Sequence, residues 1–410
     1  MKRMKLSLST AILLVAVAVF ITYQATYTAL EKRHSETVYT LTDTKSSYTK
    51  LNSVDEIVRN TYINEIDEEA LENGLIHGYL YGLGDKYASY LTEEEYENYA
   101  NQHGKSRVGL GISVTYDASL DGLYVNTVYP DTPAMTSGLC EGDIIYAVDG
   151  KTIEDRGYYE TINHITGGKP GDTVSVLVKR APDYNEYTEI VLYRDIIKNS
   201  TLEYSMYGED TGYVKISAFN TTTFDEFKTA MDDLQAQGAV RYVFDVRSNL
   251  GGELGSISKV LDYLLPEGPI IRIFSKTDGE TVISSDAECL DAPMAVLING
   301  STASAAELFA SALRDYNKAM LVGKTTFGKG TVQTMHRLSG EIGGGAISIS
   351  TGMYNPPISD NYEGKGIAPD IEVDIPEEIR ATLYRLPLES DPQFVAALRT
   401  LGVEVVQTQE

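Results

Sequence analysis

Between residues 294 and 334, short apolar runs alternate with turns and one amphipathic segment. The apolar runs at 294–298 and 319–322 have the length of buried strands. Small and apolar residues between these runs recur at helical spacing, which predicts a helix that begins near Ser304. A Gly-Lys-Gly loop at 328–330 precedes a segment of alternating polar residues. This stretch therefore predicts a strand, a helix, a second strand, a tight loop and a third strand.

The same alternation of strands and helices begins earlier, near residue 201. Strand-like runs at 211–217 and 242–246 flank an amphipathic segment at 223–237. Such an order is typical of an α/β domain. The end of the chain, from residue 376, carries two short amphipathic patches, which indicate a helical tail.

Residues 106–197 follow a different pattern. Short β-rich runs are separated by turn signals, including the hairpin-type pair Asp149-Gly150, and one helix is expected near 158–165. Residues 46–105, which precede them, have apolar positions at helical spacing and acidic residues at the expected helix starts. The chain is therefore expected to contain a helical segment, a β-rich domain and an α/β core.

An apolar run at residues 6–23 follows Lys2, Arg3 and Lys5. The run is close to the length that spans a bilayer, and its positive flank predicts a cytoplasmic N-terminus. Bulky residues at its end form no small-residue cleavage site, so an uncleaved signal anchor is favoured over a cleaved signal peptide. Residues 24–45 are polar and rich in Thr and Ser, and we expect them to form a stalk. In either case the remainder is expected outside the cytoplasm.

Composition narrows the possible functions. The formal net charge of −25 argues against a nucleic-acid-binding surface, which would need a basic patch. The two cysteines, Cys140 and Cys289, are too few for a metal cage or a disulfide framework, and they are either two thiols or one bridge. The sequence lacks the H-E-x-x-H and K-T-G motifs, and His336 is the only histidine in the α/β core. No metal or cofactor is expected.

Two residues of the 294–334 stretch are candidates for joint chemistry. Ser304 begins the helix, where free main-chain N–H groups favour negative charge. Lys329 lies between two glycines and becomes a general base if its pKa is lowered, and Gln333 would face the same side of a strand and orient the amine. The plainer alternative is a capping box of Ser304 and Glu307, a solvated loop lysine and a surface amide. Spacing alone does not join the three residues.

Two motifs in this stretch resemble those of the carboxyl-terminal processing peptidases, the tail-specific serine proteases of the S41 type. The motifs are T-A-S-A-A-E at 302–307 and F-G-K-G-T-V-Q at 327–333, and their separation matches that in the family. The resemblance implies that Ser304 is the nucleophile, Lys329 the general base and Gln333 its orienting partner.

A glycine pair near residue 250 resembles a further motif of this family, D-L-R-x-N-P-G-G, with Leu250 in place of proline. The resemblance implies an oxyanion hole made by the main-chain N–H of Gly251 or Gly252 together with that of Ala305. Without the resemblance, these glycines would be interpreted as a turn between a strand and a helix.

The β-rich region resembles a PDZ domain. Two motifs carry this resemblance: Gly109-Leu110-Gly111-Ile112, and the G-L-x-x-G-D-x-I-x-x-V-D-G core within 137–150. The resemblance implies that main-chain amides of the first motif hold the terminal carboxylate of a peptide, while the strand that follows pairs with the peptide.

The helix near 158–165 either lines the peptide groove or faces the domain core. Many relatives carry an arginine after this helix, where this chain has Thr166. In the family that arginine helps to couple peptide binding to catalysis. We therefore expect coupling in this chain to be weaker or to use another residue.

These patterns and resemblances together predict a multidomain α/β protein with a ClpP/crotonase-like protease core, a β-rich PDZ domain and an N-terminal helical segment after a transmembrane anchor. The expected boundaries are a signal anchor at 1–23, a stalk at 24–45, a helical segment at 46–105, a PDZ domain at 106–197, a peptidase core at 198–375 and a helical tail at 376–410.

The expected function is that of an extracytoplasmic serine endopeptidase, held in the cell membrane by one N-terminal helix. It would bind substrate C-termini through the PDZ domain and cleave peptide bonds with a dyad of Ser304 and Lys329. The resemblance also implies a homo-oligomer. The alternative is a PDZ scaffold whose protease core is catalytically silent, and activity on an unfolded protein distinguishes the two.

Overall fold

The structure is a computed structural model of the 410-residue chain. It describes residues 48–103, 106–129, 131–180, 184, 186–198, 200–340, 343–380 and 382–404. The chain divides into two units, with the boundary between Ile76 and His77. The expected signal anchor and stalk, residues 1–45, lie outside the described residues. Within the ranges that the structure describes, no helix has both the length and the apolar character needed to cross a membrane.

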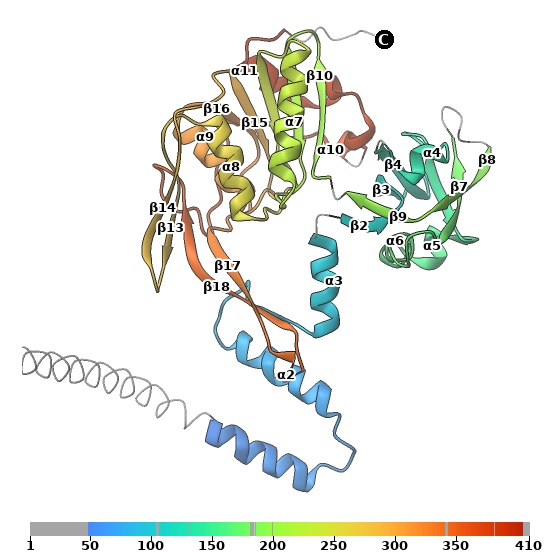
Figure 1. Ribbon diagram of the computed structural model, residues 1–410, viewed down its shortest axis with the longest axis vertical. Helices are drawn as coiled ribbons and strands as arrows, with labels where there is room; N and C mark the ends of the chain where they lie inside the picture. The colour runs from blue at the N-terminus through green and yellow to red at the C-terminus, as the bar shows by residue number, and fades with distance from the viewer. Residues whose placement is uncertain are drawn as a thin grey trace, which may run out of the picture. The chain divides into compact units, whose positions relative to one another are not determined.

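A six-stranded sheet forms the centre of the second unit (Figure 1). Its strand order is β10-β11-β12-β15-β16-β19, and all neighbours are parallel except β10 and β11. The strands are β10 (Leu202–Tyr207), β11 (Thr211–Ile216), β12 (Arg241–Asp245), β15 (Met294–Ile298), β16 (Ala319–Gly323) and β19 (Ile371–Glu372). The expected α/β core and its strands at 294–298 and 319–322 are confirmed.

Helices cover both faces of this sheet. One face packs against α7 (Thr223–Ala236), α8 (Leu254–Leu264) and α9 (Ala305–Asp315), and the other against α11 (Pro392–Thr400). Side chains along β12 alternate accordingly, because Tyr242 and Phe244 pack with the first group of helices whereas Val243 packs with α11. The tail expected at 376–410 thus contributes one helix to the second layer of the core.

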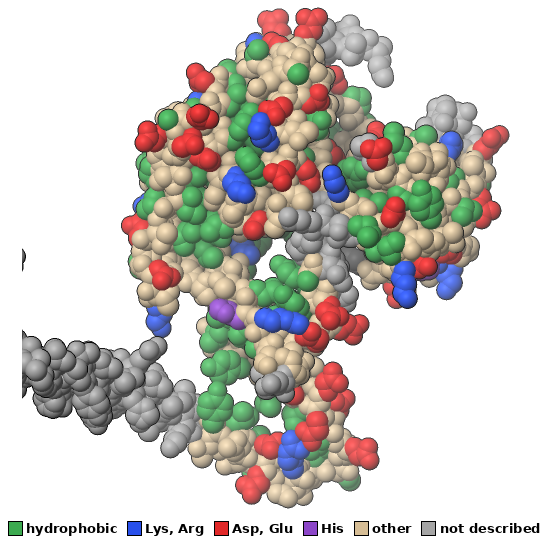
Figure 2. Space-filling view, viewed as in Figure 1, with side chains coloured by type: hydrophobic (Ala, Val, Ile, Leu, Met, Phe, Trp, Pro, Cys, Tyr) green, Lys and Arg blue, Asp and Glu red, His purple; other side chains and the backbone are tan. Residues whose placement is uncertain are grey.

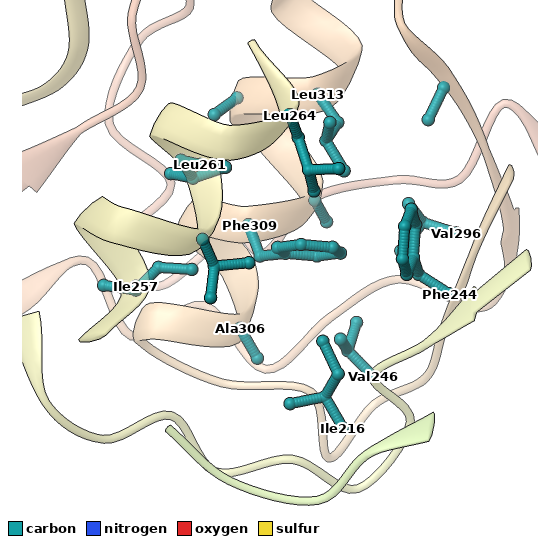
Figure 3. Packing of buried hydrophobic residues seen from close by; sticks show 14 of the residues in the cluster. Ile216, Phe244, Val246, Ile257, Leu261, Leu264, Val296, Ala306, Phe309 and Leu313 are labelled. Carbon is teal, nitrogen blue, oxygen red and sulfur yellow. The ribbon is translucent and has the colours of Figure 1, made fainter. Parts of the chain in front are cut away.

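Aromatic packing fixes the position of α9 on the sheet (Figure 3). Phe309 of α9 is fully buried. Its ring is edge-on to that of Phe244, with the ring centres 5.6 Å apart, and tilted against that of Phe219, with the ring centres 6.1 Å apart. Ile257 and Leu261 of α8 approach it from the side away from the sheet. Burial of one such ring contributes about 2–3 kcal/mol. The start of α9, where Ser304 lies, is therefore anchored to a rigid layer.

Three loops leave the same edge of the sheet. The parallel strands β12, β15 and β16 end side by side, and the chain continues from them into residues 246–252, 299–304 and 324–330. In open parallel sheets this carboxyl edge is where ligands bind. All predicted catalytic residues except Gln333 lie in these loops or on the first residue of α9.

A second sheet carries the segment that follows Lys329. Its order is β1-β18-β13-β14, with β17 also paired to β18. The strands are β1 (Ser89–Leu91), β13 (Gly268–Ser275), β14 (Gly279–Ser285), β17 (Thr331–Arg337) and β18 (Ala346–Asn355). The segment expected to be helical at 46–105 contains α2 (Glu68–Tyr81) and α3 (Glu93–His103), but β1 between them joins the sheet of the core by pairing with β18.

The β-rich region that resembles a PDZ domain is built on the sheet β3-β4-β5-β7-β8, with a short β6 paired to β5. Its strands are β3 (Ile112–Asp117), β4 (Gly122–Val128), β5 (Ile144–Val148), β6 (Lys151–Thr152), β7 (Thr173–Lys179) and β8 (Tyr187–Tyr193), and its helices are α4 (Pro133–Thr136), α5 (Ile153–Arg156) and α6 (Tyr158–Thr166). A separate pair, β2 (Ser106–Gly109) and β9 (Asp195–Lys198), lies at the ends of the domain. Strand β3 is the edge of its sheet, so it is able to accept a further strand.

The surface is acidic, as the net charge of −25 requires. On the face drawn in Figure 2, Asp and Glu side chains are spread over the α/β core and the β-rich domain, and Lys and Arg side chains occur singly or in small groups. No extended basic patch appears on this face.

Candidate active site

Ser304 occupies a strained position at the start of α9. Its main-chain angles are φ 57° and ψ −121°, a conformation that residues other than glycine rarely adopt. The residue is 8% exposed. The preceding residues are fixed to the neighbouring loop, because Thr302 Oγ1 donates to the Val246 carbonyl at 2.9 Å and the Ala303 N–H donates to the Asn249 carbonyl at 2.9 Å. Strain held by its surroundings in this way is typical of functional residues.

The glycine pair lies directly against Ser304. A Cβ placed on Gly251 would lie 2.8 Å from both the Ala305 nitrogen and the Ser304 Cβ, so only glycine fits there. The Gly251 N–H donates to Oδ1 of the buried Asn249 at 2.8 Å. Gly252 has φ 143°, and a Cβ on it would lie 1.8 Å from the Phe219 carbonyl oxygen. Gly251 therefore lies in contact with the start of α9, whereas Gly252, the next residue, packs against the main chain of Phe219.

Glu307 joins the serine to the lysine loop. Its side chain is fully buried on the first turn of α9. Oε2 accepts from the main-chain N–H of Ser304 at 2.9 Å and from that of Lys329 at 2.8 Å. Oε1 accepts from the Gly328 N–H at 2.7 Å and from the Thr326 hydroxyl. The sequence indicated Glu307 only as half of a capping box, whereas the same carboxylate also fixes the loop that carries Lys329.

Lys329 lies in the loop before β17 and is half-buried. Burial lowers the pKa of its amine below the usual value for lysine, against nearby carboxylates, of which Glu363 is the strongest, that raise it. Its Nζ lies 5.0 Å from the centre of the Tyr87 ring. A lysine with a lowered pKa in a partly enclosed site is a candidate general base.

Gln333 is held by partners on β18 and on its own strand. Its Nε2 donates to Thr331 Oγ1 at 2.8 Å and to Ser350 Oγ at 3.2 Å. The alternation that would place Gln333 on the same side as Lys329 does not apply, because Lys329 precedes β17 and a register shift falls between Val332 and Gln333. The role of Gln333 as orienting partner stays a prediction.

The turn between α2 and β1 supplies further residues of the site. Asp85 accepts from the Ser350 N–H at 2.8 Å and from its hydroxyl at 3.0 Å, which links this turn to the partner of Gln333. Glu363, from the loop after β18, accepts from the Gly330 N–H at 2.7 Å. Asp85, Tyr87 and Glu363 were not among the predicted site residues, because they are far from Lys329 along the chain and no sequence pattern joins them to it.

A buried ionic network lies at the base of the glycine loop. Arg247 pairs with Asp245 and with Asp391, in both cases at 2.6 Å, and the Tyr213 hydroxyl donates to Asp245 at 2.8 Å. Burial alone would raise the pKa of Asp245, but the charge and hydrogen bonds of Arg247 hold it below its usual value. Asp391 also caps α11 through the Gln393 N–H, so the network fixes α11 relative to the glycine loop.

The predicted carboxylate-binding loop of the PDZ domain lines a small cavity of about 40 Å³. Gly111 has φ 84°, and a Cβ there would lie 2.2 Å from Thr132, so glycine is required. Leu110 is buried in the domain core. The residues lining the cavity are Gly109, Leu110, Gly111, Ile112, Tyr129, Ile165, Thr166, Ile197, Lys198 and Ser200. The loop and the end of α6 thus face a common space beside the edge strand β3.

The described residues contain no group of three or more His, Cys, Asp and Glu side chains arranged to hold a metal ion. Cys140 is exposed and Cys289 is half-buried, and both are free thiols. Of the two alternatives for the cysteines, the structure therefore has separate thiols.

Comparison with known proteins identifies three regions of the chain. The model of peptidase family S41 matches residues 210–373, the PDZ domain model matches residues 108–189, and the model described as the activating protease CtpB N-terminal domain matches residues 12–95. The first match contains Ser304 and Lys329, and the second contains the loop at 109–112.

Individual relatives agree with these matches. The chain is 33% identical over 342 residues to a carboxy-terminal-processing protease of Bartonella bacilliformis, covering 82% of this chain and 76% of the relative. It is 28% identical over 366 residues to the carboxy-terminal processing protease CtpA of Bacillus subtilis, covering 88% and 76% of the two chains. A solved S41 protease from Bacteroides fragilis has the same fold, with a TM-score of 0.56 at 16% identity over 83% of this chain and 91% of that one.

The strained serine, the glycine pair and the half-buried lysine thus lie at one edge of an α/β core that matches a peptidase family over most of its length. A PDZ domain precedes that core. The alignment with the Bartonella protease covers 82% of this chain and therefore extends into both regions. The chain therefore belongs to the carboxy-terminal-processing serine proteases of peptidase family S41.

Proposed function

We propose that Ser304 and Lys329 form a catalytic dyad that hydrolyses peptide bonds. The observation that carries the proposal is the buried carboxylate of Glu307, which binds the main-chain N–H groups of both residues and so ties the two loops together. The neutral amine of Lys329 takes the proton of the Ser304 hydroxyl, and the Ser304 Oγ attacks the substrate carbonyl carbon. The protonated amine then gives this proton to the leaving nitrogen as the C–N bond breaks. In the second half, Lys329 takes a proton from water, the water oxygen attacks the acyl carbon, and the Ser304 Oγ leaves with that proton.

The developing oxyanion is bound by two main-chain donors. We assign these to the N–H groups of Gly252 and Ala305. Gly251 is the weaker candidate, because its N–H already donates to Asn249. Loss of one such donor typically costs about 3 kcal/mol of transition-state stabilisation.

The PDZ domain delivers substrate C-termini to the dyad in this proposal. The edge strand β3 is available for pairing, and Gly111, the residue before it, has the positive φ of 84° that favours glycine. The terminal carboxylate would be held by the amides of residues 109–112. The cavity of about 40 Å³ is small and is lined by this loop, so we assign the terminal carboxylate to it.

We also place the catalytic part outside the cytoplasm, behind an uncleaved N-terminal anchor. The support is the sequence of residues 2–23, with its positive flank and apolar run. Protease treatment of intact cells and then of lysed cells tests this placement, and protection of the chain in intact spheroplasts would contradict it. A homo-oligomer is proposed from the exposed apolar residues Leu51, Val54 and Ile57 on the helix at 48–61, and sedimentation of the full-length chain tests it.

Cleavage of fluorescently labelled casein by the full-length protein tests the dyad. We expect the wild type to cleave it, and Ser304→Ala and Lys329→Ala to lose at least about a thousandfold in kcat/KM. Ser301→Ala, an exposed serine three residues earlier, is the matched control and should keep full activity. If Lys329→Ala cleaves as fast as the wild type, another base acts and His336 is the first to test. If the wild type binds peptides but does not cleave, the chain is a PDZ scaffold.

A further inference from the structure

A second lysine lies beside the proposed base. Lys86, in the turn between α2 and β1, pairs through Nζ with Oε1 of Glu363 at 2.9 Å. The same Nζ lies 4.7 Å from the centre of the Tyr87 ring, and Lys329 Nζ lies 5.0 Å from that centre. The two Nζ atoms are therefore within about 10 Å of each other, a distance at which a charge on Lys86 still disfavours a second charge on Lys329.

Glu363 forms the ion pair with Lys86, and its charge also acts on Lys329. It accepts from the Gly330 N–H at 2.7 Å, next to Lys329 in the chain, and its Oε1 lies 3.5 Å from the Tyr87 hydroxyl. Its side chain is 24% exposed, so water screens its charge only in part. Among the charges near Lys329, that of Glu363 raises the pKa of the Lys329 amine the most.

The other charged groups around Lys329 have partners of their own. Glu307, from α9, accepts four hydrogen bonds from its own helix start and from the 326–329 loop. Asp85 accepts from the main chain and hydroxyl of Ser350, and the phenol of Tyr87 presents its ring face to the amine. Glu363 is thus the one carboxylate among those acting on Lys329 whose ion-pair partner, within the described residues, is a different lysine.

Lys86 is charged whenever Lys329 titrates. The hydroxyl of Tyr87 and the carboxylate of Glu363 hold the pKa of Lys86 above its usual value, whereas burial lowers that of Lys329. The positive charge of Lys86 acts on Lys329 in two ways. It neutralises Glu363, which would otherwise favour a protonated base, and it repels a second positive charge nearby.

We propose that Lys86 is a positioning residue that keeps the amine of Lys329 neutral at working pH, by holding Glu363 in an ion pair and by its own charge. The proposal rests on the proposed Ser304–Lys329 dyad. A proton on Lys329 blocks its action as a base, so without Lys86 a larger share of the enzyme would be inactive at a given pH.

The test compares kcat/KM on labelled casein from pH 5 to pH 10 for full-length wild type, Lys86→Met and Lys86→Arg. A unit charge about 10 Å away shifts a pKa by about 0.3 in bulk water and by about 1 near a protein surface. Because the Lys86 side chain is 58% exposed, we expect the acid limb of Lys86→Met to move to higher pH by about 0.3–1, so that activity falls about twofold to tenfold on the limb and stays at the wild-type level on the plateau. Lys86→Arg keeps the charge and should retain the wild-type profile.

Two further variants separate charge from structure. Lys228→Met removes an exposed lysine that is paired with Asp232 at 2.8 Å on α7, and it should leave the profile unchanged. Glu363→Gln added to Lys86→Met removes the carboxylate that is no longer neutralised, and should return the limb toward the wild-type position. A fall of Lys86→Met by the same factor at every pH, with the limb unmoved, would mean that Lys86 only supports the turn, and would overturn the proposal.

A second readout does not depend on turnover. Competitive labelling with acetic anhydride, read by peptide mass spectrometry over the same pH range, gives the pKa of the Lys329 amine directly. We expect that pKa to rise in Lys86→Met and not in Lys86→Arg. If Ser304→Ala still cleaves casein, the dyad is wrong while the labelling still decides the effect of Lys86. If Ser304→Ala is inactive and the labelling curves coincide, the dyad stands and the inference about Lys86 fails.

Discussion

Replacing Glu307 by glutamine tests the link between the two catalytic loops. The carboxylate receives two donors on each oxygen, Ser304 and Lys329 on Oε2 and Gly328 and Thr326 on Oε1. A carboxamide has one accepting oxygen and one NH₂ group. Whichever way it is oriented, the NH₂ group faces at least one main-chain N–H, and two of the four donors lose their acceptor.

The size of the effect follows from these lost bonds. A hydrogen bond to a charged group contributes about 1.5–3 kcal/mol, so two lost bonds amount to about 3–6 kcal/mol. The site is fully buried, so water does not replace the acceptor. We expect the free energy of unfolding of the protease core to fall by about 3 kcal/mol, the lower end of this range. Such a loss is large, because a whole protein is stabilised by only about 5–15 kcal/mol. The serine and lysine would also lose their alignment, with a decrease in kcat of about a hundredfold or more.

Urea unfolding followed by far-UV circular dichroism measures the stability, since the chain contains no tryptophan for fluorescence. Casein cleavage by the folded variant measures kcat. Glu377→Gln, at an exposed glutamate in the first turn of α10 (Glu377–Arg380), is the matched control and should change neither quantity. If Glu307→Gln loses less than about 1 kcal/mol and keeps normal kcat, the carboxylate does not tie the loops together and the reasoning is refuted.

Three further predictions concern the same edge of the sheet. Gly252→Ala should abolish casein cleavage, because its Cβ would lie 1.8 Å from the Phe219 carbonyl oxygen, and a variant with normal kcat would contradict the tight approach. The kcat/KM of the wild type should rise with pH as the Lys329 amine, whose pKa is lowered by burial, loses its proton; a flat profile from about pH 5 to about pH 9 would exclude a lysine base. The pairing that lowers the pKa of Asp245 stabilises the wild type above the unfolded value of about 4, and this contribution is lost as pH falls through the folded pKa. In Arg247→Met, burial would instead raise the pKa of Asp245, so the deficit in Tm against wild type should be largest at pH 7 and should shrink toward pH 4; a deficit independent of pH would be evidence against the ion pair.

Local pattern was sufficient for the elements of the core. The apolar runs that became β15 and β16 and the helical spacing that became α9 each depend on neighbours within a few positions. Ser304 could be placed at the helix start for the same reason. Its positive φ could not be predicted, because that angle is imposed by contacts of the preceding residues with the loop after β12.

The surroundings of Lys329 could not be predicted from the sequence, because they are assembled from distant segments. Asp85 and Tyr87 come from a turn before the PDZ domain, and Glu363 comes from a loop after β18. Gln333 shows a different failure. Strand periodicity predicts that its side chain lies on the same side as that of Lys329. One register shift at the start of β17 changes which side of the strand each residue faces, so the periodicity no longer applies.

The main-chain conformation of Ser304 has a consequence for protein engineering. Any residue other than glycine held at φ 57° and ψ −121° stores about 1–3 kcal/mol, whereas glycine adopts this conformation freely. A Ser304→Gly enzyme should therefore melt at a higher temperature than the wild type. A library screened for heat resistance alone would be drawn to that substitution, and its best-scoring members would no longer cut peptide bonds.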